Sequence, residues 1–335
     1  MASLKPDAGQ IRNVLNDLTE KESIKRTERR WWPRFVFHYT DIRNAVGILQ
    51  DGQLHSRQYA ESQDKLKVSS GSPSVLAVTD LVIKDCVRLY FRPKTPTQYY
   101  VEGICSQATL SKSKFRDAHC PVPVFFLFDS IEILSRADCR FSDGGLNSSE
   151  ARILSTAVDL EQLPWKKIYH TGRFNPHQAE QSDIAFRRNA EVIVPRRLNL
   201  SALRYIYCRS EAERETLLHL LPPDLQQQYQ DKIVASTRSD LFYRPQTFIE
   251  TVRLSSEAVY FRFSPETKSP GPFHLRVQVE VASSQHSLEA ESFKLERPYV
   301  LQIPLPFLST DYTIRLYLDD HLAYANTCEK MEIPF

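Results

Sequence analysis

Glycine is scarce in this chain, and so are the loops that cradle phosphates with backbone amides. The 335 residues include 9 glycines, against 20 prolines and 15 tyrosines. Neither the G-x-G-x-x-G pattern of dinucleotide-binding loops nor the G-x-x-x-x-G-K-[ST] pattern of P-loops occurs. The longest apolar run, around 122–128, is far too short to span a bilayer. We therefore expect no Gly-rich phosphate loop and no membrane segment.

Paired cysteines are missing as well. The six cysteines are scattered, without a C-x-x-C pair, which disfavours a zinc ribbon, thioredoxin chemistry and a disulfide scaffold. No H-E-x-x-H or G-x-S-x-G motif and no spaced carboxylate pair stands out. The N-terminus also lacks the apolar stretch of a signal peptide. We expect a cytoplasmic protein with reduced thiols and no metal.

Charge of one sign is not in excess over the whole chain. Lysine and arginine number 43 and aspartate and glutamate 41, a net charge of +2. With 25% charged and 41% hydrophobic residues, the composition is that of a globular protein of about two domains. The global balance neither indicates nor excludes nucleic acid, because a local patch decides that question.

The first two thirds of the chain mix helices and short strands. An apolar stripe of Ile11, Val14, Leu15 and Leu18 predicts a helix from residue 8 to about 30. Its basic end reads KRTERRWWPR (25–34), which suits either a helix C-terminus or a basic-aromatic surface for nucleic acid. Further expected features are strands over 35–40, 87–91, 121–128, 191–194 and 205–208, helices from Asp41 to 49 and over 211–221, a turn over 141–147 and a loop over 55–74.

The last third has a different character. Short alternating or β-branched segments occupy 247–254, 258–263, 273–281, 299–303 and 312–318, with turns between them. Such spacing predicts a β-sandwich. The chain is therefore expected to be an α+β domain over 1–235, followed by an all-β, immunoglobulin-like sandwich over 236–335 that serves interactions.

Two titratable residues lie in apolar strands. Glu191 opens the strand EVIV, and a carboxylate there is costly to bury unless it is paired. It either forms a salt bridge with Arg187 or Arg188 or faces a cleft. His38 lies within the strand FVFHYT, where a histidine is more often structural than catalytic.

Four blocks in series resemble the DarT-type ADP-ribosyltransferase toxins, which attach ADP-ribose from NAD to bases in single-stranded DNA. They are FHYTDIRNAVGIL (37–49), VRLYFRPKTPTQYY (87–100), CPVPVFFLF (120–128) with FSDGGLN (141–147), and RRNAEVIVPRRLNLSALRYIYC (187–208). The resemblance covers about 35–221 and implies an ADP-ribosyltransferase-like split β-sheet core. Poly(ADP-ribose) polymerases are more distantly similar, with a His, Tyr and Glu each on its own strand, here matched by His38, Tyr90 and Glu191.

The resemblance also implies roles for individual residues, with NAD as co-substrate. Glu191 would bond the ribose 2′-hydroxyl and stabilise the oxocarbenium-like sugar left when nicotinamide departs. The other implied contacts to NAD are His38 and Thr40 on the ribose or the nicotinamide amide, Tyr90 or Tyr99 on the nicotinamide ring, and Asn44 on the dinucleotide. No metal is implied.

Arginines gather around Glu191. Residues 187–209 hold six arginines and one acid, a local excess of +5. Together with Arg92 and Lys94, Arg187 and Arg188 are expected to contact nucleic-acid phosphates, unless these arginines pair with acids elsewhere in the chain. An unpaired substrate is the simpler case, because a base inside a duplex would have to flip out. Single-stranded DNA and RNA both remain open.

The chain departs from the family pattern in two places. It reads Arg92-Pro93-Lys94 where the family has Pro-Arg-Ser, and the family's NAD-binding arginine has only Arg57 and Arg88 as candidates. We expect a mono-ADP-ribosyltransferase toxin from a toxin–antitoxin or phage-defence system, with an antitoxin or chaperone as partner. The alternatives are transfer to protein, a decayed module that binds NAD or nucleic acid without turnover, and an adaptor whose sandwich is the active part.

Overall fold

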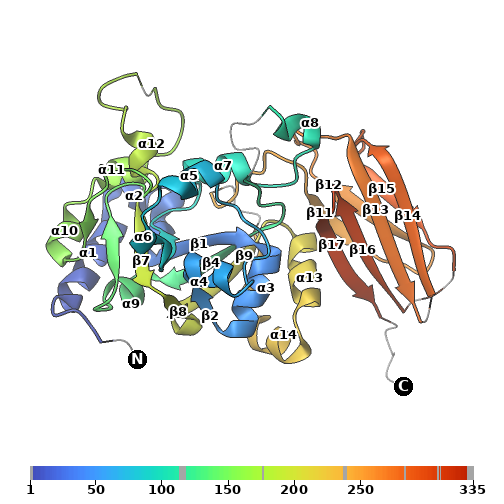
Figure 1. Cartoon of the computed structure of the whole chain (residues 1–335), viewed down its shortest axis with the longest axis horizontal. Coiled ribbons are helices and arrows are strands. Elements are labelled where there is room, and N and C mark those ends of the chain that lie inside the picture. The colour runs from blue at the N-terminus through green and yellow to red at the C-terminus, as the bar shows by residue number, and fades with distance from the viewer. Residues whose placement is uncertain are drawn as a thin grey trace. The chain divides into compact units, whose positions relative to one another are not determined.

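Two compact units make up the computed structural model, which describes residues 3–112, 118–175, 177–236, 240–282, 284–307, 309 and 311–329 (Figure 1). The first unit comprises Met1–Tyr100, Phe125–Ile206 and Arg238–Phe242. The second comprises Val101–Val124, Tyr207–Thr237 and Tyr243–Phe335. Within the described residues, no helix combines the length and the apolarity that crossing a membrane requires.

A sheet of eight strands forms the core of the first two thirds of the chain. The strand order is β10-β9-β4-β1-β3-β7-β5-β6, and β2 pairs separately with β8. The run that forms β4 is buried along almost its whole length, which fits a strand covered on both faces. The bounds are β1 Phe35–Asp41, β2 Gln53–His55, β3 Cys86–Tyr90, β4 Pro123–Asp129, β5 Arg140–Ser142, β6 Ile153–Leu154, β7 Glu191–Pro195, β8 Arg197–Asn199, β9 Leu203–Cys208 and β10 Ile233–Ala235.

Helices of one to four turns connect and cover these strands. The helices are α1 Ala8–Glu20, α2 Glu22–Lys25, α3 Ile42–Asp51, α4 Arg57–Ser62, α5 Pro73–Val78, α6 Leu81–Lys84, α7 Pro96–Val101, α8 Gln107–Leu110, α9 Ser130–Leu134, α10 Ala157–Glu161, α11 Trp165–Ile168, α12 Ile184–Arg187, α13 Glu211–Leu220 and α14 Pro223–Tyr229, with 3₁₀ turns η1 Glu28–Arg34 and η2 Leu200–Ala202.

Two expectations about the helical regions are wrong. The predicted helix over 8–30 ends at Glu20, because Lys21 adopts an extended ψ of 128°. The predicted loop over 55–74 contains α4, whose first turn is capped by the Ser56 hydroxyl. By contrast, α3 starts and stops where expected: Asp41 caps its first turn, and Gly52 follows in the left-handed conformation with φ 64°.

The C-terminal strands form two all-β sheets, as predicted (Figure 1). One sheet has the order β11-β12-β15 and the other β14-β13-β16-β17, and their inner faces share one apolar core. Strands one, two and five in one sheet and three, six and seven in the other follow the immunoglobulin arrangement, with the fourth beside the third. The bounds are β11 Ile249–Arg253, β12 Ala258–Phe263, β13 Phe273–Val281, β14 Ser284–Phe293, β15 Val300–Pro304, β16 Tyr312–Leu318 and β17 His321–Cys328.

Candidate active site

Glu191 stands in a row of residues that crosses three neighbouring strands. It is the first residue of β7 and lies opposite Tyr90 of β3, and Tyr90 in turn lies opposite Phe37 of β1. Residues paired in this way place their side chains on the same face of a sheet. His38 follows Phe37 and is one residue out of this row. The three strands that carry His38, Tyr90 and Glu191 are therefore adjacent.

The Glu191 carboxylate is buried, with 1% of the residue exposed, and it is tightly held. Arg88 donates from Nε to Oε2 at 2.5 Å and from Nη2 to Oε1 at 2.7 Å, while the Leu146 amide donates to Oε1 at 3.0 Å. A carboxylate offers about four acceptor positions. Three are used by these contacts, so Oε2 retains one position for a further donor such as a sugar hydroxyl.

Arg88 was not expected as the salt-bridge partner of Glu191. The sequence suggested Arg187 or Arg188, which adjoin Glu191 along the chain. Arg88 reaches the carboxylate because it lies two residues before Tyr90 on the adjacent strand, on the same face of the pleat. Burial alone would lower the pKa of Arg88, but the Glu191 charge more than offsets it and raises that pKa. The guanidinium therefore stays charged.

Tyr90 is an uncharged ring beside this ion pair. Burial, followed by the nearby negative charge of Glu191, raises the pKa of the Tyr90 phenol to about 12. At neutral pH the phenol keeps its proton, so Tyr90 offers a ring face and a hydroxyl rather than a base.

A glycine-containing turn after β5 holds Glu191 from the other side. The Glu191 amide donates to Ser142 Oγ at 3.0 Å, and the Ser142 hydroxyl donates to the Gly144 carbonyl at 2.7 Å. A Cβ added at Gly144 would lie 2.1 Å from Cζ of Phe186, so no larger residue fits without movement. The sequence predicted the turn, but its contact with the carboxylate, through the Leu146 amide, was missed.

His38 is a neutral ring of defined tautomer. Its Nδ1 lies 3.1 Å from the Arg88 carbonyl oxygen, and because a carbonyl only accepts, Nδ1 carries the proton. Burial lowers the pKa of His38 to about 4, although that hydrogen bond opposes the shift. In the neutral ring, Nε2 is consequently an acceptor.

Asn44 is bonded entirely within the protein. Its Oδ1 accepts from the amides of Lys67 and Val68, and its Nδ2 donates to the Val68 carbonyl and to Thr40 Oγ1. These contacts use both acceptor positions and both amide hydrogens. Asn44 therefore positions the 67–68 segment and Thr40, and the amide has no donor left for a dinucleotide.

Arg92 does not lie on a basic surface, so the structure contradicts its expected contact with nucleic acid. The residue is 2% exposed. Its guanidinium donates to the carbonyls of Ile168 and His170 and packs over the Trp32 ring, 4.9 Å from the ring centroid. Arg92 thus ties the 168–170 segment to the end of β3.

The other residues expected at nucleic acid are partly engaged inside the protein. Arg187 pairs with Asp143 at 2.8 Å and with Asp183 at 3.1 Å, as the alternative interpretation had it. Arg188, 8% exposed, donates to His170 Nδ1 at 2.7 Å.

The segment after β3 carries Lys94 and two tyrosines. Lys94 has a left-handed φ of 55°, and its amide donates to Gln98 Oε1 at 2.7 Å. Tyr99 and Tyr100 are 42% and 47% exposed. Their rings pack edge-on against each other, with the centroids 5.4 Å apart. Among the described residues, no cluster of three or more His, Cys, Asp or Glu side chains is placed to hold a metal ion.

Comparison with known families places the chain. A family profile described as ssDNA thymidine ADP-ribosyltransferase, DarT, matches residues 37–243. The chain belongs to the DarT family. The expectation of an NAD-dependent ADP-ribosyltransferase that modifies a base in single-stranded nucleic acid is thereby confirmed, and the nucleic acid of the family is DNA. The match ends before β11, so the C-terminal sheets lie outside it.

Solved structures of DarT proteins are similar to this chain. Thermus sp. 2.9 DarT in complex with ADP-ribosylated ssDNA is 19% identical, with a TM-score of 0.49 over 63% of this chain and 97% of the Thermus chain. The same protein in complex with NAD+ is 18% identical, with a TM-score of 0.45 over 63% and 98%. Thermosipho africanus DarTG in complex with ADP-ribose is 18% identical, with a TM-score of 0.42 over 58% and 51%. No curated protein matches at the sequence level.

Proposed function

We propose that the protein transfers ADP-ribose from NAD to a thymidine base in single-stranded DNA, and that Glu191 is the residue at which the ribose reacts. The family match supports the reaction. The observation that carries the site is the buried Glu191 carboxylate, held by Arg88 and the Leu146 amide with one acceptor position to spare.

The chemistry needs a fixed negative charge and a place for one proton. The bond between the ribose C1 and nicotinamide breaks, and nicotinamide leaves with the electron pair. A ring atom of the base then bonds to C1 and gives its proton to the Glu191 carboxylate. The open position on Glu191 accepts the ribose 2′-hydroxyl, and the carboxylate stabilises the positive charge that develops on the sugar. Removing such preorganised stabilisation typically costs a factor of about 10²–10³ in rate.

The surrounding residues take supporting roles. His38 accepts a hydroxyl of the ribose at Nε2, and Tyr90 or Tyr99 stacks on the nicotinamide ring. Thr40 contacts the ribose or the nicotinamide amide. Asn44 acts indirectly, as a positioning residue.

Arg88 is the better of the two candidates for the NAD-binding arginine. It lies at the carboxylate, whereas Arg57 is bonded to Glu61 and Ser69. We assign Lys94 to the DNA side on the strength of its charge. Arg187 is neutralised by Asp143 and Asp183 and Arg188 is 8% exposed, so neither is assigned there.

Label transfer from NAD that carries a tagged adenosine tests the proposal. Single-stranded DNA, RNA and cell protein are offered separately to the wild type, to Glu191→Gln and to Glu180→Gln, an exposed carboxamide control. We expect labelled DNA from the wild type and from Glu180→Gln, and at least a hundredfold less from Glu191→Gln. Label on RNA or protein alone would contradict the proposal that DNA is the acceptor. Full activity of Glu191→Gln would contradict the assignment of Glu191 to the active site.

We further propose that the protein acts in the cytoplasm as the toxin of a toxin–antitoxin or phage-defence pair. The region over 236–335 is proposed as a domain that an antitoxin or a chaperone contacts, with 1–235 as the transferase domain. Growth arrest on expression of the wild type but not of Glu191→Gln is the expected result. A decayed binding module would instead release no nicotinamide from NAD in the presence of DNA.

A further inference from the structure

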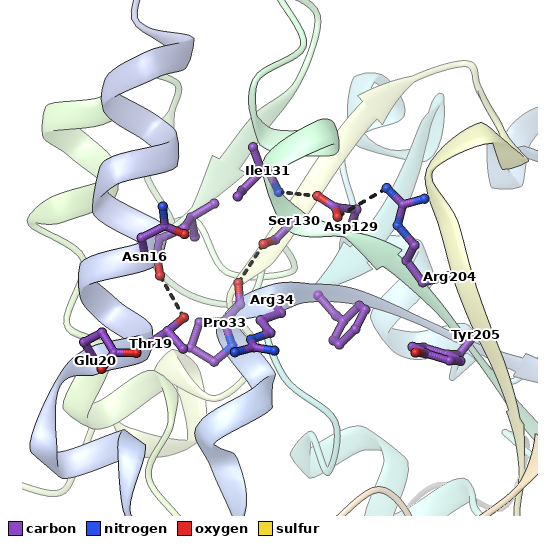
Figure 2. Close-up of a pocket in the computed structure, with 12 residues that line it drawn as sticks. Asn16, Thr19, Glu20, Pro33, Arg34, Asp129, Ser130, Ile131, Arg204 and Tyr205 are labelled. Carbon is purple, nitrogen blue, oxygen red and sulfur yellow. Dashed lines mark hydrogen bonds and ion pairs between the residues drawn. The ribbon is translucent and has the colours of Figure 1, made fainter.

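A groove of about 550 Å³ opens between α1, the start of β1 and β9 (Figure 2). The acids that line it are paired, Glu20 with Lys25 and Asp129 with Arg204. Phe37, which is fully buried, lies between this groove and the reacting centre. The groove is therefore set apart from the reaction, whereas the loop that follows β3 is connected to it.

The loop that follows β3 leads directly out of the reacting centre. Tyr90 ends β3 opposite Glu191. The next residue, Phe91, is still tied to the strand of Glu191, because its amide donates to the Ala190 carbonyl at 3.4 Å. Lys94 follows Tyr90 by four residues, so their Cα atoms are at most about 14 Å apart. The conformation of this loop therefore decides where the charge of Lys94 lies relative to Glu191.

Lys94 holds a backbone conformation that lysine rarely adopts. Its φ of 55° lies in the left-handed region, which favours glycine and asparagine. Pro93 and Pro96 bracket it, and the fixed φ angles of two prolines leave so short a loop few alternatives. A strained residue persists only where its surroundings hold it, and such residues gather at functional sites. Some contact must therefore hold the Lys94 backbone in this conformation.

The side chain of Gln98 in α7 supplies that contact. Gln98 is 2% exposed, and its Oε1 accepts from the Lys94 amide at 2.7 Å. Its own amide donates to Thr95 Oγ1 at 3.3 Å, which closes the turn between the two residues. On its other side, Nε2 donates to the Leu241 carbonyl at 2.9 Å. Because the oxygen of a carboxamide accepts and its nitrogen donates, one planar group connects the loop to the segment over 240–242.

The segment over 240–242 is a firm support for that bond. It belongs to the first unit although it follows β10 in the sequence. Leu241 and Phe242 are 0% and 1% exposed, and the Phe242 ring lies 5.3 Å from the ring of Phe125. Asp240 accepts from Trp31 Nε1 at 2.5 Å. The glutamine carboxamide therefore cannot swing away without breaking a buried hydrogen bond to a fixed carbonyl.

We propose that Gln98 is a positioning residue for the transfer reaction, which holds the loop over 92–98 so that the charge of Lys94 faces the DNA. Gln98 acts through Lys94 and does not itself touch the substrate. Without Oε1, the strained backbone loses the bond that holds it and returns to an ordinary conformation, which redirects the lysine side chain. The inference rests on the proposed function, in which Lys94 lies on the DNA side.

Binding of a labelled single-stranded oligonucleotide, measured by fluorescence anisotropy without NAD over a range of salt concentrations, tests the inference. Lys94→Gln should reduce the slope of log affinity against log salt by about 0.7, the value for one phosphate on a single strand. Gln98→Met, which changes no charge, should reduce the slope by as much. The double variant should lose no more than either single variant, because both changes remove one contact. Gln10→Met, the same change at an exposed glutamine, is the control.

A role of Gln98 in stability alone would not move these readouts. Gln98→Glu keeps an acceptor oxygen for the Lys94 amide and should restore most of the slope, with thermal unfolding as the check on folding. In steady-state transfer, Gln98→Met should raise KM for DNA as Lys94→Gln does and keep kcat near the wild-type value. Should Gln98→Met fail to fold, Gln98→Asn replaces it, because a side chain shorter by one methylene cannot reach both partners.

The inference and the proposed function fail in different ways. If the wild type transfers no label to DNA yet the slopes change as expected, the proposed function fails and the role of Gln98 in DNA binding stands. If Glu191-dependent transfer to DNA occurs but folded Gln98→Met keeps the wild-type slope and KM, the function stands and the inference is overturned. Losses of slope that add in the double variant, or an unchanged slope in Lys94→Gln, would overturn it as well.

Discussion

The ion pair between Arg88 and Glu191 holds both side chains in place. Removing either charge destabilises the fold, because the other charge is then left buried and unpaired. Both are desolvated, with side-chain exposures of 24% and 1%. Loss of one partner from a buried pair leaves an uncompensated charge and costs about 3–5 kcal/mol, whereas loss of both charges is far less costly. Stability and catalysis should therefore respond differently to the same substitutions.

A double-mutant cycle separates the two effects. Arg88→Gln should lower the free energy of unfolding by about 3 kcal/mol and also reduce transfer, because Glu191 loses the donor that orients it. Adding Glu191→Gln should recover most of the stability while activity stays absent. Urea denaturation measures the free energy of unfolding, and label transfer measures the activity. Additive losses of stability in the double variant would contradict the coupling.

His38 should make stability depend on pH. Burial lowers its pKa from 6.5 to about 4, so between these values the unfolded chain binds a proton that the folded protein does not. Stability from this residue is full above pH 6.5 and falls as the pH falls towards 4. Between pH 7 and pH 5 the wild type should lose about 2 kcal/mol more than His38→Gln. Equal losses of stability in the wild type and in His38→Gln would show that the His38 ring is not held neutral by burial. His177→Gln, at an exposed histidine, is the control.

Residue types in their local context singled out the candidate residues, and their roles stay predictions. Glu191 was found because an acid that opens an apolar strand is conspicuous, and His38 and Tyr90 because they lie in neighbouring blocks of the family pattern. Arg88 as the partner of Glu191 could not be read from the sequence, because it depends on the register between β3 and β7. The burial of Arg92 depends likewise on carbonyls some 76 residues away along the chain.

At the scale of elements, the turn between β5 and β6 determines how Glu191 is presented. Ser142 fixes the backbone of Glu191 and Leu146 fixes its carboxylate, so a shift of this turn moves both contacts. This turn packs against α12, because Gly144 lies against the ring of Phe186.

Gly144→Ala should therefore reduce activity through geometry alone. Its Cβ would meet Phe186 at 2.1 Å, which must displace the ring or the turn and cost about 1–3 kcal/mol of stability. We expect kcat to fall more than the affinity for DNA. Gly47→Ala in α3 is the matched control, since a Cβ there meets nothing within 4 Å and should be neutral or stabilising. Wild-type kcat in Gly144→Ala would show that the turn does not position the carboxylate.

The sequence predicted best those elements whose buried apolar residues form a clear run or stripe and whose ends carry a residue that starts or stops the element. β4 and α3 are examples, the latter bounded by Asp41 and Gly52. β14 was missed because its side chains are nearly all exposed, and an exposed edge strand needs no apolar alternation. The long N-terminal helix was overextended because its stripe of apolar residues does not reveal the backbone turn at Lys21.

At the scale of the whole molecule, the second unit is built from three separate stretches of the chain. Its sandwich core includes Ile104 and Ala212, which come from stretches that lie before the sandwich in the sequence. The Thr216 hydroxyl of α13 accepts from the Ala325 amide of β17, and Tyr324 donates to Glu215 at 2.7 Å. Composition alone marked a boundary near residue 236, whereas packing in this unit extends back to residues 101–124 and 207–237.

This interleaving predicts the outcome of a truncation after Ala235. The shortened chain would keep α13 and Ile104 but lose the strands on which they pack, exposing core surface that the full chain buries. Since burying a large apolar side chain contributes about 1.5–3 kcal/mol, we expect the truncated protein to aggregate or to melt well below the full chain. Size-exclusion chromatography and thermal unfolding measure this, with the wild-type full chain as the reference. A monomeric truncated protein that melts cooperatively and labels DNA would show instead that residues 1–235 fold and act without the sandwich.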